Sequence, residues 1–186
     1  MKRILVLCLV VCFSVVGISG VASAATRAGD STIMGTLSYD ADNFSTESGG
    51  DVDMSIFSAA IGVGRFFTDN FEAEIGLIGQ TITIDEGSGS ETLQQMGLQV
   101  RPNFHFNTAS NTVPYLGLTL GYLWVDLFGG DGSGFMYGGQ AGIKQFVSEN
   151  SYLQFELGYT ASDLEIEDTD VALGDFRFSL GVGYKF

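Results

Sequence analysis

The residues at the end of the chain alternate strictly in polarity. From Phe176 to Phe186, every second side chain is apolar, and the positions between them, such as Arg177 and Lys185, are polar or small. Only a β-strand has a period of two residues. A soluble sandwich buries its apolar faces, whereas a membrane barrel turns them outward and needs an even number of such strands. The number of similar segments therefore decides between the two.

The start of the chain has the three parts of a secretory signal peptide. Lys2-Arg3 precedes an apolar run over residues 4–18, and the small residues Ala22-Ser23-Ala24 follow. The apolar run is too short for a membrane-spanning helix. We expect residues 1–24 to be a cleaved signal peptide and residues 25–186 to form one domain. Both cysteines lie in the peptide, so the mature chain would contain no disulfide.

Eight segments of the mature chain alternate in this way. One of them carries Glu72 and Glu74 on the same face, and two carboxylates on one strand face cannot be turned toward lipid. Eight is an allowed, even number of strands. The pattern therefore predicts an all-β fold, an eight-stranded antiparallel up-and-down transmembrane β-barrel. The predicted strands are residues 31–39, 54–67, 71–80, 95–106, 115–125, 135–146, 152–160 and 175–186.

Two short motifs extend this pattern to a family. The chain resembles small outer-membrane barrels of Gram-negative bacteria in its signal peptide, its eight alternating segments and two short motifs. These motifs are Pro114-Tyr115-Leu116-Gly117 and the terminal Gly183-Tyr184-Lys185-Phe186. These include the OmpX-like, OmpW-like and opacity-type barrels and the transmembrane domain of OmpA. The resemblance implies a porin-like barrel in the outer membrane, in contact with lipid and lipopolysaccharide. The chain would reach the outer membrane through the periplasm. It also implies that the barrel-assembly machinery reads Leu180, Val182, Tyr184 and Phe186.

Connections between the strands are predicted to alternate in length. The short ones, at residues 68–70, 107–114 and 147–151, would face the periplasm, and longer ones would lie outside the cell.

The lumen is predicted to hold a network of charged side chains. If the third hairpin is symmetric about Gly87 and Ser88, Glu74 falls opposite Arg101. Lys144 and Glu156 are expected to approach each other across the turn at residues 147–151. Because the interior of eight strands is about wide enough for side chains to fill, we predict a plug in its lower half. The predicted network consists of Glu72, Glu74, Arg101, His105, Lys144, Glu156 and Arg177.

A catalytic role is not expected. Lipid-modifying barrels need a serine and a histidine close together near the outer leaflet. His105 is the one histidine of the chain, falls at the periplasmic end, and has Asn107 two residues further on. We therefore predict a non-enzymatic protein with no catalytic residues.

The outer connections are acidic and contain no lysine or arginine. Such a surface repels nucleic acid, and its simplest role is a solvated surface facing an extracellular ligand or partner. Clustered carboxylates also suit Ca²⁺ or Mg²⁺, so a cation site is a second hypothesis. Its residues would be Asp163, Glu165, Glu167, Asp168 and Asp170. The other predicted loop acids are Asp40, Asp42, Glu47, Asp51, Asp53, Asp85, Glu86, Glu91, Asp126 and Asp131. Alternation within residues 163–173 also suggests a hairpin that continues above the membrane.

Two functions are compatible with these features. The first is a structural or surface-interaction role for a plugged barrel with acidic outer loops. The alternative is an OmpW-like narrow conduit for small hydrophobic molecules, which needs an apolar upper lumen. The alternation places five apolar residues on the lumen side of the outer strand ends, where they could form such a lining: Ile78, Ile82, Leu123, Val125 and Met136.

Overall fold

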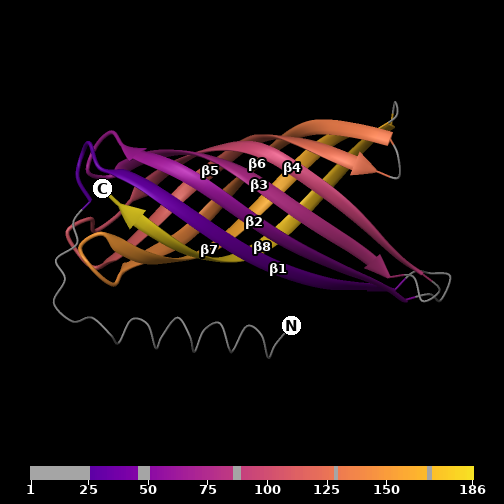
Figure 1. Cartoon of the computed structure of the whole chain (residues 1–186), viewed down its shortest axis with the longest axis horizontal. Coiled ribbons are helices and arrows are strands. Elements are labelled where there is room, and N and C mark those ends of the chain that lie inside the picture. The colour runs from indigo at the N-terminus through magenta and orange to yellow at the C-terminus, as the bar shows by residue number, and fades with distance from the viewer. Residues whose placement is uncertain (1–25, 46–50, 86–88, 128–129, 167–168) are drawn as a thin grey trace.

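The computed structural model describes residues 26–45, 51–85, 89–127, 130–166 and 169–186 (Figure 1). The predicted signal peptide, residues 1–24, lies outside the described residues. Within the described part, no helix is long and apolar enough to cross a membrane.

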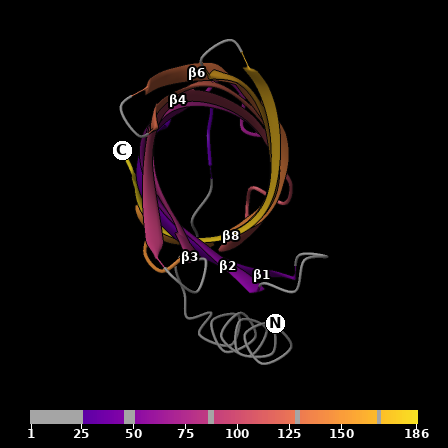
Figure 2. The same cartoon turned by 90° about the vertical axis from the view of Figure 1, so that its right-hand side faces the viewer.

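Eight strands form one closed antiparallel barrel in which each strand pairs with its neighbours in sequence and β1 pairs with β8. Figure 2 shows the strands as a ring seen along the barrel. The predicted fold class is therefore confirmed. The strands are β1 (Ser31–Ser45), β2 (Asp51–Phe66), β3 (Phe71–Asp85), β4 (Ser90–His105), β5 (Thr112–Leu127), β6 (Gly130–Phe146), β7 (Ser151–Ile166) and β8 (Thr169–Lys185).

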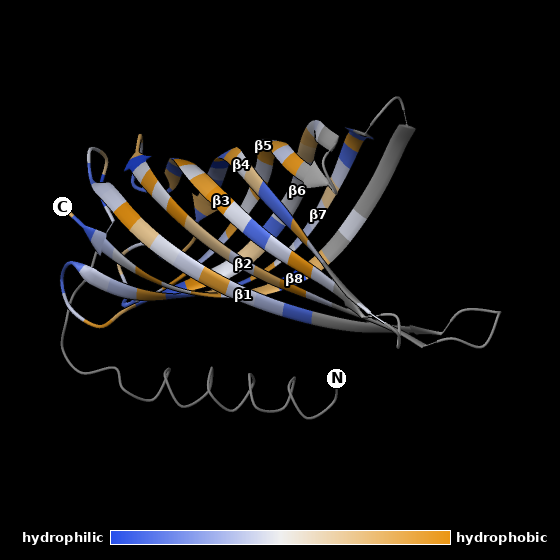
Figure 3. Cartoon of the chain, turned by 45° about the vertical axis from the view of Figure 1, so that its right-hand side comes forward, coloured by the Kyte–Doolittle hydropathy of each residue, from blue (hydrophilic) through white to orange (hydrophobic). Residues whose placement is uncertain are grey.

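The pleat of the barrel turns apolar side chains outward and polar side chains inward, as predicted. Phe104 and Leu180 are 49% and 47% exposed on the outer face, whereas Arg101 is 4% exposed inside. Figure 3 shows the resulting alternation of hydrophobic and hydrophilic bands along the strands. This polarity is the reverse of a soluble β-protein and matches a barrel surrounded by lipid.

Aromatic side chains on the outer face form two belts. Three turns, at residues 67–70, 106–111 and 147–150, lie at the same end of the barrel as the end of β8. We call this end the lower end and the opposite end the upper end. Aromatic rings favour the two interfaces of a membrane. The lower belt contains Phe67, Phe71, Phe104, Phe106 and Phe186, and the upper belt contains Tyr39, Phe57, Trp124, Tyr137, Tyr159 and Phe176.

The upper parts of the strands are longer than the alternation predicted. β1 continues to Ser45 and β2 starts at Asp51, so Asp40, Asp42 and Asp53 belong to paired strands and not to a loop. The predicted long outer connections are therefore wrong for most of their length. The reason is that the β-ladder satisfies backbone groups above the apolar belt as well as within it, and pairing does not require an apolar outer face. The predicted extension of the last hairpin is confirmed, because β7 reaches Ile166 and β8 starts at Thr169.

The seam between β1 and β8 is the shortest ladder of the barrel. Its register runs from Thr32 opposite Lys185 to Ser38 opposite Ser179, whereas the ladder with β2 runs along the whole of β1. Above Ser38 and Ser179, the described residues of β1 and β8 pair only with β2 and β7. The seam therefore ends near the upper aromatic belt, which contains Tyr39.

The segment before β1 crosses the lower end of the barrel. Thr26 donates its backbone N–H to the Thr108 carbonyl (3.1 Å) and its hydroxyl to the Asp69 carbonyl (2.9 Å). Ala28 donates its N–H to the Asp69 carboxylate at 2.8 Å. Because Thr26 is 2% exposed, this segment covers part of the lower mouth and joins two of its turns.

The outward pleat can be tested on Leu120, which faces outward in the middle of β5 and is 57% exposed. A charged side chain at the middle of the bilayer costs about 2–4 kcal/mol. We therefore expect Leu120→Arg to lower the free energy of unfolding from lipid vesicles by about this amount. The control is Val147→Arg in a lower turn, where the side chain is 60% exposed and water is close. Equal stability of the two variants in a urea titration would contradict the pleat.

Candidate functional site

The lower lumen contains a carboxylate surrounded by three donors. The side chain of Glu72, which is fully buried, accepts hydrogen bonds from Thr32 (2.6 Å) and Lys144 (2.6 Å). His105 Nε2 lies 3.0 Å from the same carboxylate. These donors come from β1, β6 and β4, so the interaction crosses the barrel and ties together strands that are not neighbours.

A second layer of charge lies around Arg101. Its guanidinium donates to Glu74 at 3.3 Å and to Glu156, and the Tyr115 hydroxyl donates to Glu156 at 2.5 Å. The predicted register, Glu74 opposite Arg101, is confirmed. This layer joins β3, β4, β5 and β7 across the lumen. Because β3 and β4 also contribute to the layer around Glu72, the two layers are connected.

The predicted approach of Lys144 to Glu156 is wrong. Lys144 lies opposite Gln154 on β7, and its ammonium group bonds to Glu72, whereas Glu156 bonds to Arg101. Reasoning from the nearest turn considered only adjacent strands. In a narrow barrel, long side chains also reach strands on the far wall, and the tilt of the strands decides which ones meet.

Two buried tyrosines were not part of the predicted network. Lys144 Nζ lies 4.9 Å from the ring centroid of Tyr152 and 5.9 Å from that of Tyr115, within the range of cation–π contacts. Tyr115 and Tyr152 are among the largest fully buried side chains. Leu116 was predicted to face outward, and adjacent residues of a strand face opposite sides. The sequence could therefore have indicated that the Tyr115 ring points inward.

Inward-facing glycines make room for these large groups. A Cβ at Gly183 would lie 2.1 Å from the Tyr152 ring, and one at Gly142 would lie 2.5 Å from Tyr115. A Cβ at Gly64 would come within 2.6 Å of the Glu72 carboxylate. The glycines on β2, β6 and β8 are therefore matched to the aromatic and charged side chains that fill the lower lumen.

His105 is packed as a structural residue. Its ring lies 5.0 Å from that of Phe66 and 5.4 Å from that of Tyr115 between centroids, and the residue is fully buried. Its Nδ1 has no hydrogen-bond partner among the described residues. Among the described residues, His105 is surrounded by two aromatic rings, a carboxylate and an ammonium group.

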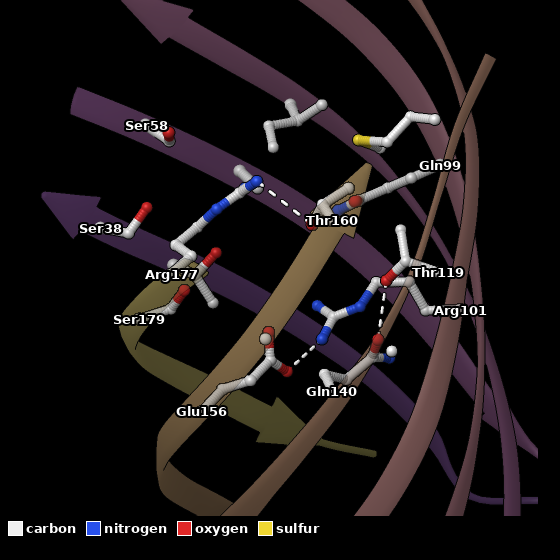
Figure 4. A pocket seen from close by; sticks show the side chains of 16 residues that line it. Ser38, Ser58, Gln99, Arg101, Thr119, Gln140, Glu156, Thr160, Arg177 and Ser179 are labelled. Carbon is white, nitrogen blue, oxygen red and sulfur yellow. Dashed lines mark hydrogen bonds and ion pairs between the residues drawn. The ribbon is translucent and has the colours of Figure 1, made fainter. Parts of the chain in front are cut away.

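A third group of polar side chains, from β4, β5 and β6, lies beside Arg101. The Thr119 hydroxyl donates to Gln140 at 2.7 Å, and the Gln140 amide donates to Asn103 at 2.9 Å. Figure 4 shows Thr119 and Gln140 in the lining of a small cavity, with Arg177 from β8 on the side of that cavity nearest the seam. Arg177, the last member of the predicted network, lies in the lumen above the other charges and donates to the Thr160 hydroxyl at 3.4 Å.

The acidic residues proposed for a cation lie near the upper end of β7 and β8. Asp163 pairs with Ala172 and Glu165 with Asp170 in the ladder, while Glu167 and Asp168 lie outside the described residues. Among the residues that the structure describes, no three histidine, cysteine or acidic side chains are grouped so that they could hold a metal ion.

The terminal pattern assigned to assembly lies on the outer face. Val182, Tyr184 and Phe186 are 63%, 48% and 67% exposed, and Leu180 is 47% exposed. These side chains form a continuous apolar row on β8 beside the seam.

Comparison with known proteins identifies the family of this barrel. The model of the outer membrane protein β-barrel domain matches residues 8–186. No curated protein sequence matches the chain.

Several solved structures match this barrel. The chain is similar to Neisserial surface protein A, with a TM-score of 0.61, 19% identity and coverage of 86% of this chain and 98% of that one. It is also similar to the outer membrane protein OprG from Pseudomonas aeruginosa, with a TM-score of 0.63, 16% identity and coverage of 89% and 99%. At these identities the likeness concerns the fold.

The energetic role of the Glu72–Lys144 pair can be tested by removing one partner. Lys144→Met leaves the carboxylate without its ammonium partner in a buried site, and we expect a loss of about 3–5 kcal/mol in unfolding free energy. The double variant Lys144→Met/Glu72→Gln should recover part of this loss, because no uncompensated charge remains.

Lys185→Met is the matched control. Its ion pair with Asp30 spans 3.3 Å and is partly exposed, 13% and 23% for the two side chains, so a loss of about 0–1 kcal/mol is expected. A Lys144→Met variant as stable as Lys185→Met in denaturant titrations would contradict the proposed role.

Proposed function

This chain belongs to the outer-membrane β-barrel protein family of Gram-negative bacteria, and on that premise we propose a non-enzymatic barrel with a structural or surface-interaction role. Its lower lumen is closed by a plug of buried ion pairs. Its upper rim presents acidic residues to the environment. Lipid and lipopolysaccharide surround the apolar belt.

The layered network in the lower lumen is the observation that carries this proposal. Glu72, Arg101 and Lys144 are 0%, 4% and 1% exposed, so the charges are removed from water. Donors and acceptors on β1, β3, β4, β5, β6 and β7 meet in the lumen. A pathway for hydrated solutes would have to separate these pairs, each at the cost of leaving a buried charge without its partner.

The acidic upper strands support a role at the cell surface. Beside Asp40, the paired upper parts of β1 and β2 contain Asp42, Asp51 and Asp53 and no lysine or arginine. Long-range attraction therefore favours cationic partners and disfavours nucleic acid.

A narrow conduit for small hydrophobic molecules is the second candidate. The five residues predicted for its lining are all buried, between 2% and 8% exposed. Four of them, Ile78, Leu123, Val125 and Met136, form one cluster with Leu164. This apolar cluster in the upper lumen is the observation that favours the conduit over a purely structural barrel.

Planar-bilayer recordings can test the plug. We expect the wild-type barrel to show no stable open-channel steps, because the lower lumen is filled. Tyr115→Ala/Tyr152→Ala removes two of the largest fully buried side chains and should produce brief, small openings. Tyr137→Ala, which faces outward and is 47% exposed, is the matched control and should remain silent. Stable large steps from the wild-type protein would refute the plug.

Vesicles that contain the barrel can separate the two candidates. Entry of an uncharged hydrophobic dye faster than into protein-free vesicles, at unchanged ion conductance, would rank the conduit first. Equal rates of entry would favour the structural or surface role.

A further inference from the structure

A cavity of about 100 Å³ lies in the upper lumen, and we call it the upper cavity. A smaller cavity of about 40 Å³, the one drawn in Figure 4, adjoins it, because Met136, Thr160 and Arg177 line both. Residues from seven strands, β2 to β8, line the upper cavity. It therefore lies inside the closed barrel and not on the lipid-facing surface.

Two glutamine side chains lie next to each other on one wall of the upper cavity. Gln80 on β3 and Gln95 on β4 are direct partners in the ladder, and both line the cavity. The Gln80 amide donates an N–H to the Ser58 hydroxyl at 3.1 Å, and its carbonyl oxygen accepts no hydrogen bond from a described residue. Ser162 on β7 contributes a hydroxyl to the same cavity. The polar wall therefore presents both donors and acceptors.

The side chains of Gln95 and Ser162 are buried but have no hydrogen-bond partner among the described residues. They are 6% and 8% exposed. Elsewhere in the lumen, buried amides such as those of Gln140 and Asn103 bond to each other. Buried polar groups are almost always hydrogen-bonded, because an amide that is covered loses its bonds to water. A molecule inside the upper cavity would restore the missing bonds.

The opposite wall of the upper cavity is apolar. Ile82, Leu123 and Met136, from β3, β5 and β6, line it and are between 2% and 8% exposed. A buried water molecule needs about two to four polar partners, and this wall offers none. A molecule that has a hydrogen-bonding head and an apolar body therefore matches the two walls better than a cluster of water does.

The charge in the lining is already engaged. Among the described residues, Arg177 is the charged residue that lines the upper cavity. It donates to the Thr160 hydroxyl at 3.4 Å and has further interactions of its own. An anion would have to compete with these interactions, and a cation would meet a charge of the same sign. An uncharged ligand avoids both costs, because it carries no charge out of water.

We propose that the upper cavity binds a small uncharged carboxamide, with its amide at Gln95 and a short aliphatic body against Leu123 and Met136. A carboxamide has a donor and an acceptor side by side, so it can form two hydrogen bonds with the Gln95 amide. Its second N–H can be donated to the carbonyl oxygen of Gln80. The volume limits the body to about three or four carbon atoms, because the cavity that accommodates benzene is larger, about 150 Å³. This site goes beyond the proposed structural or surface role.

Saturation-transfer difference NMR on the full barrel in deuterated detergent micelles tests the site with three probes of the same shape. Isobutyramide has the amide head, methyl isopropyl ketone has a methyl group in place of the amide nitrogen, and isobutyrate has a charged oxygen there. We expect isobutyramide to bind at least about tenfold tighter than the ketone, because the ketone has no N–H to donate. Isobutyrate should bind more weakly than isobutyramide, because its charge would leave water while Arg177 is engaged elsewhere.

Two glutamine variants locate the binding. Gln95→Leu removes the amide at similar side-chain size, and it should weaken isobutyramide at least about tenfold and leave the ketone unchanged. Gln94→Leu makes the same change at the adjacent, exposed position of β4 and should change neither. Empty micelles give the background from partitioning into detergent.

Equal binding of isobutyramide and the ketone to the wild-type barrel would overturn the proposal, as would tighter binding of isobutyrate or equal effects of the two variants. Binding of none of the three probes would also overturn it, and would mean that the cavity holds water alone. The comparison of head groups on the wild-type protein decides the question even if Gln95→Leu does not fold. A conductance recording reports on the plug independently, so failure of the upper cavity as a binding site is distinguishable from failure of the proposed closed barrel.

Discussion

Closure of the backbone ladder is the constraint on which the rest of this molecule depends. Hydrocarbon offers no hydrogen-bond partners, so a membrane-spanning sheet must satisfy its N–H and C=O groups internally. Eight antiparallel strands do this by pairing β1 with β8. The pairs between Thr32 and Ser38 on β1 suffice, because they span from the lower end to the upper aromatic belt. Above that level water can hydrate the strand edges, and the seam is free to end.

The closed ladder also determines what the lumen must contain. Alternation forces every second side chain inward, and eight strands leave an interior that side chains must fill. Here the filling is charged, and each charge lies against an opposite one: Glu72 with Lys144, Glu74 and Glu156 with Arg101. Inward glycines at positions such as Gly142 and Gly183 prevent overcrowding by the tyrosines. Small and large residues thus complement each other across the barrel.

Alternation made the architecture and the direction of each side chain predictable. Glu74 opposite Arg101 followed as well, because a hairpin has one register once its turn is placed. The partners of Lys144 did not follow, since its contact with Glu72 joins residues 72 positions apart and depends on how the tilted strands carry side chains across the lumen. The upper strands were also underestimated, because their pairing continues where the apolar pattern stops.

The lumen has two levels with different physical properties. Below, each buried charge is fixed by several partners, so motion there would separate ions in a medium of low polarity. Above, Ile82, Leu123 and Met136 share the lining of the lumen with serine and threonine hydroxyls and with Arg177. Because these ion pairs join β3, β4, β6 and β7, the upper lumen rests on walls that are already held relative to one another.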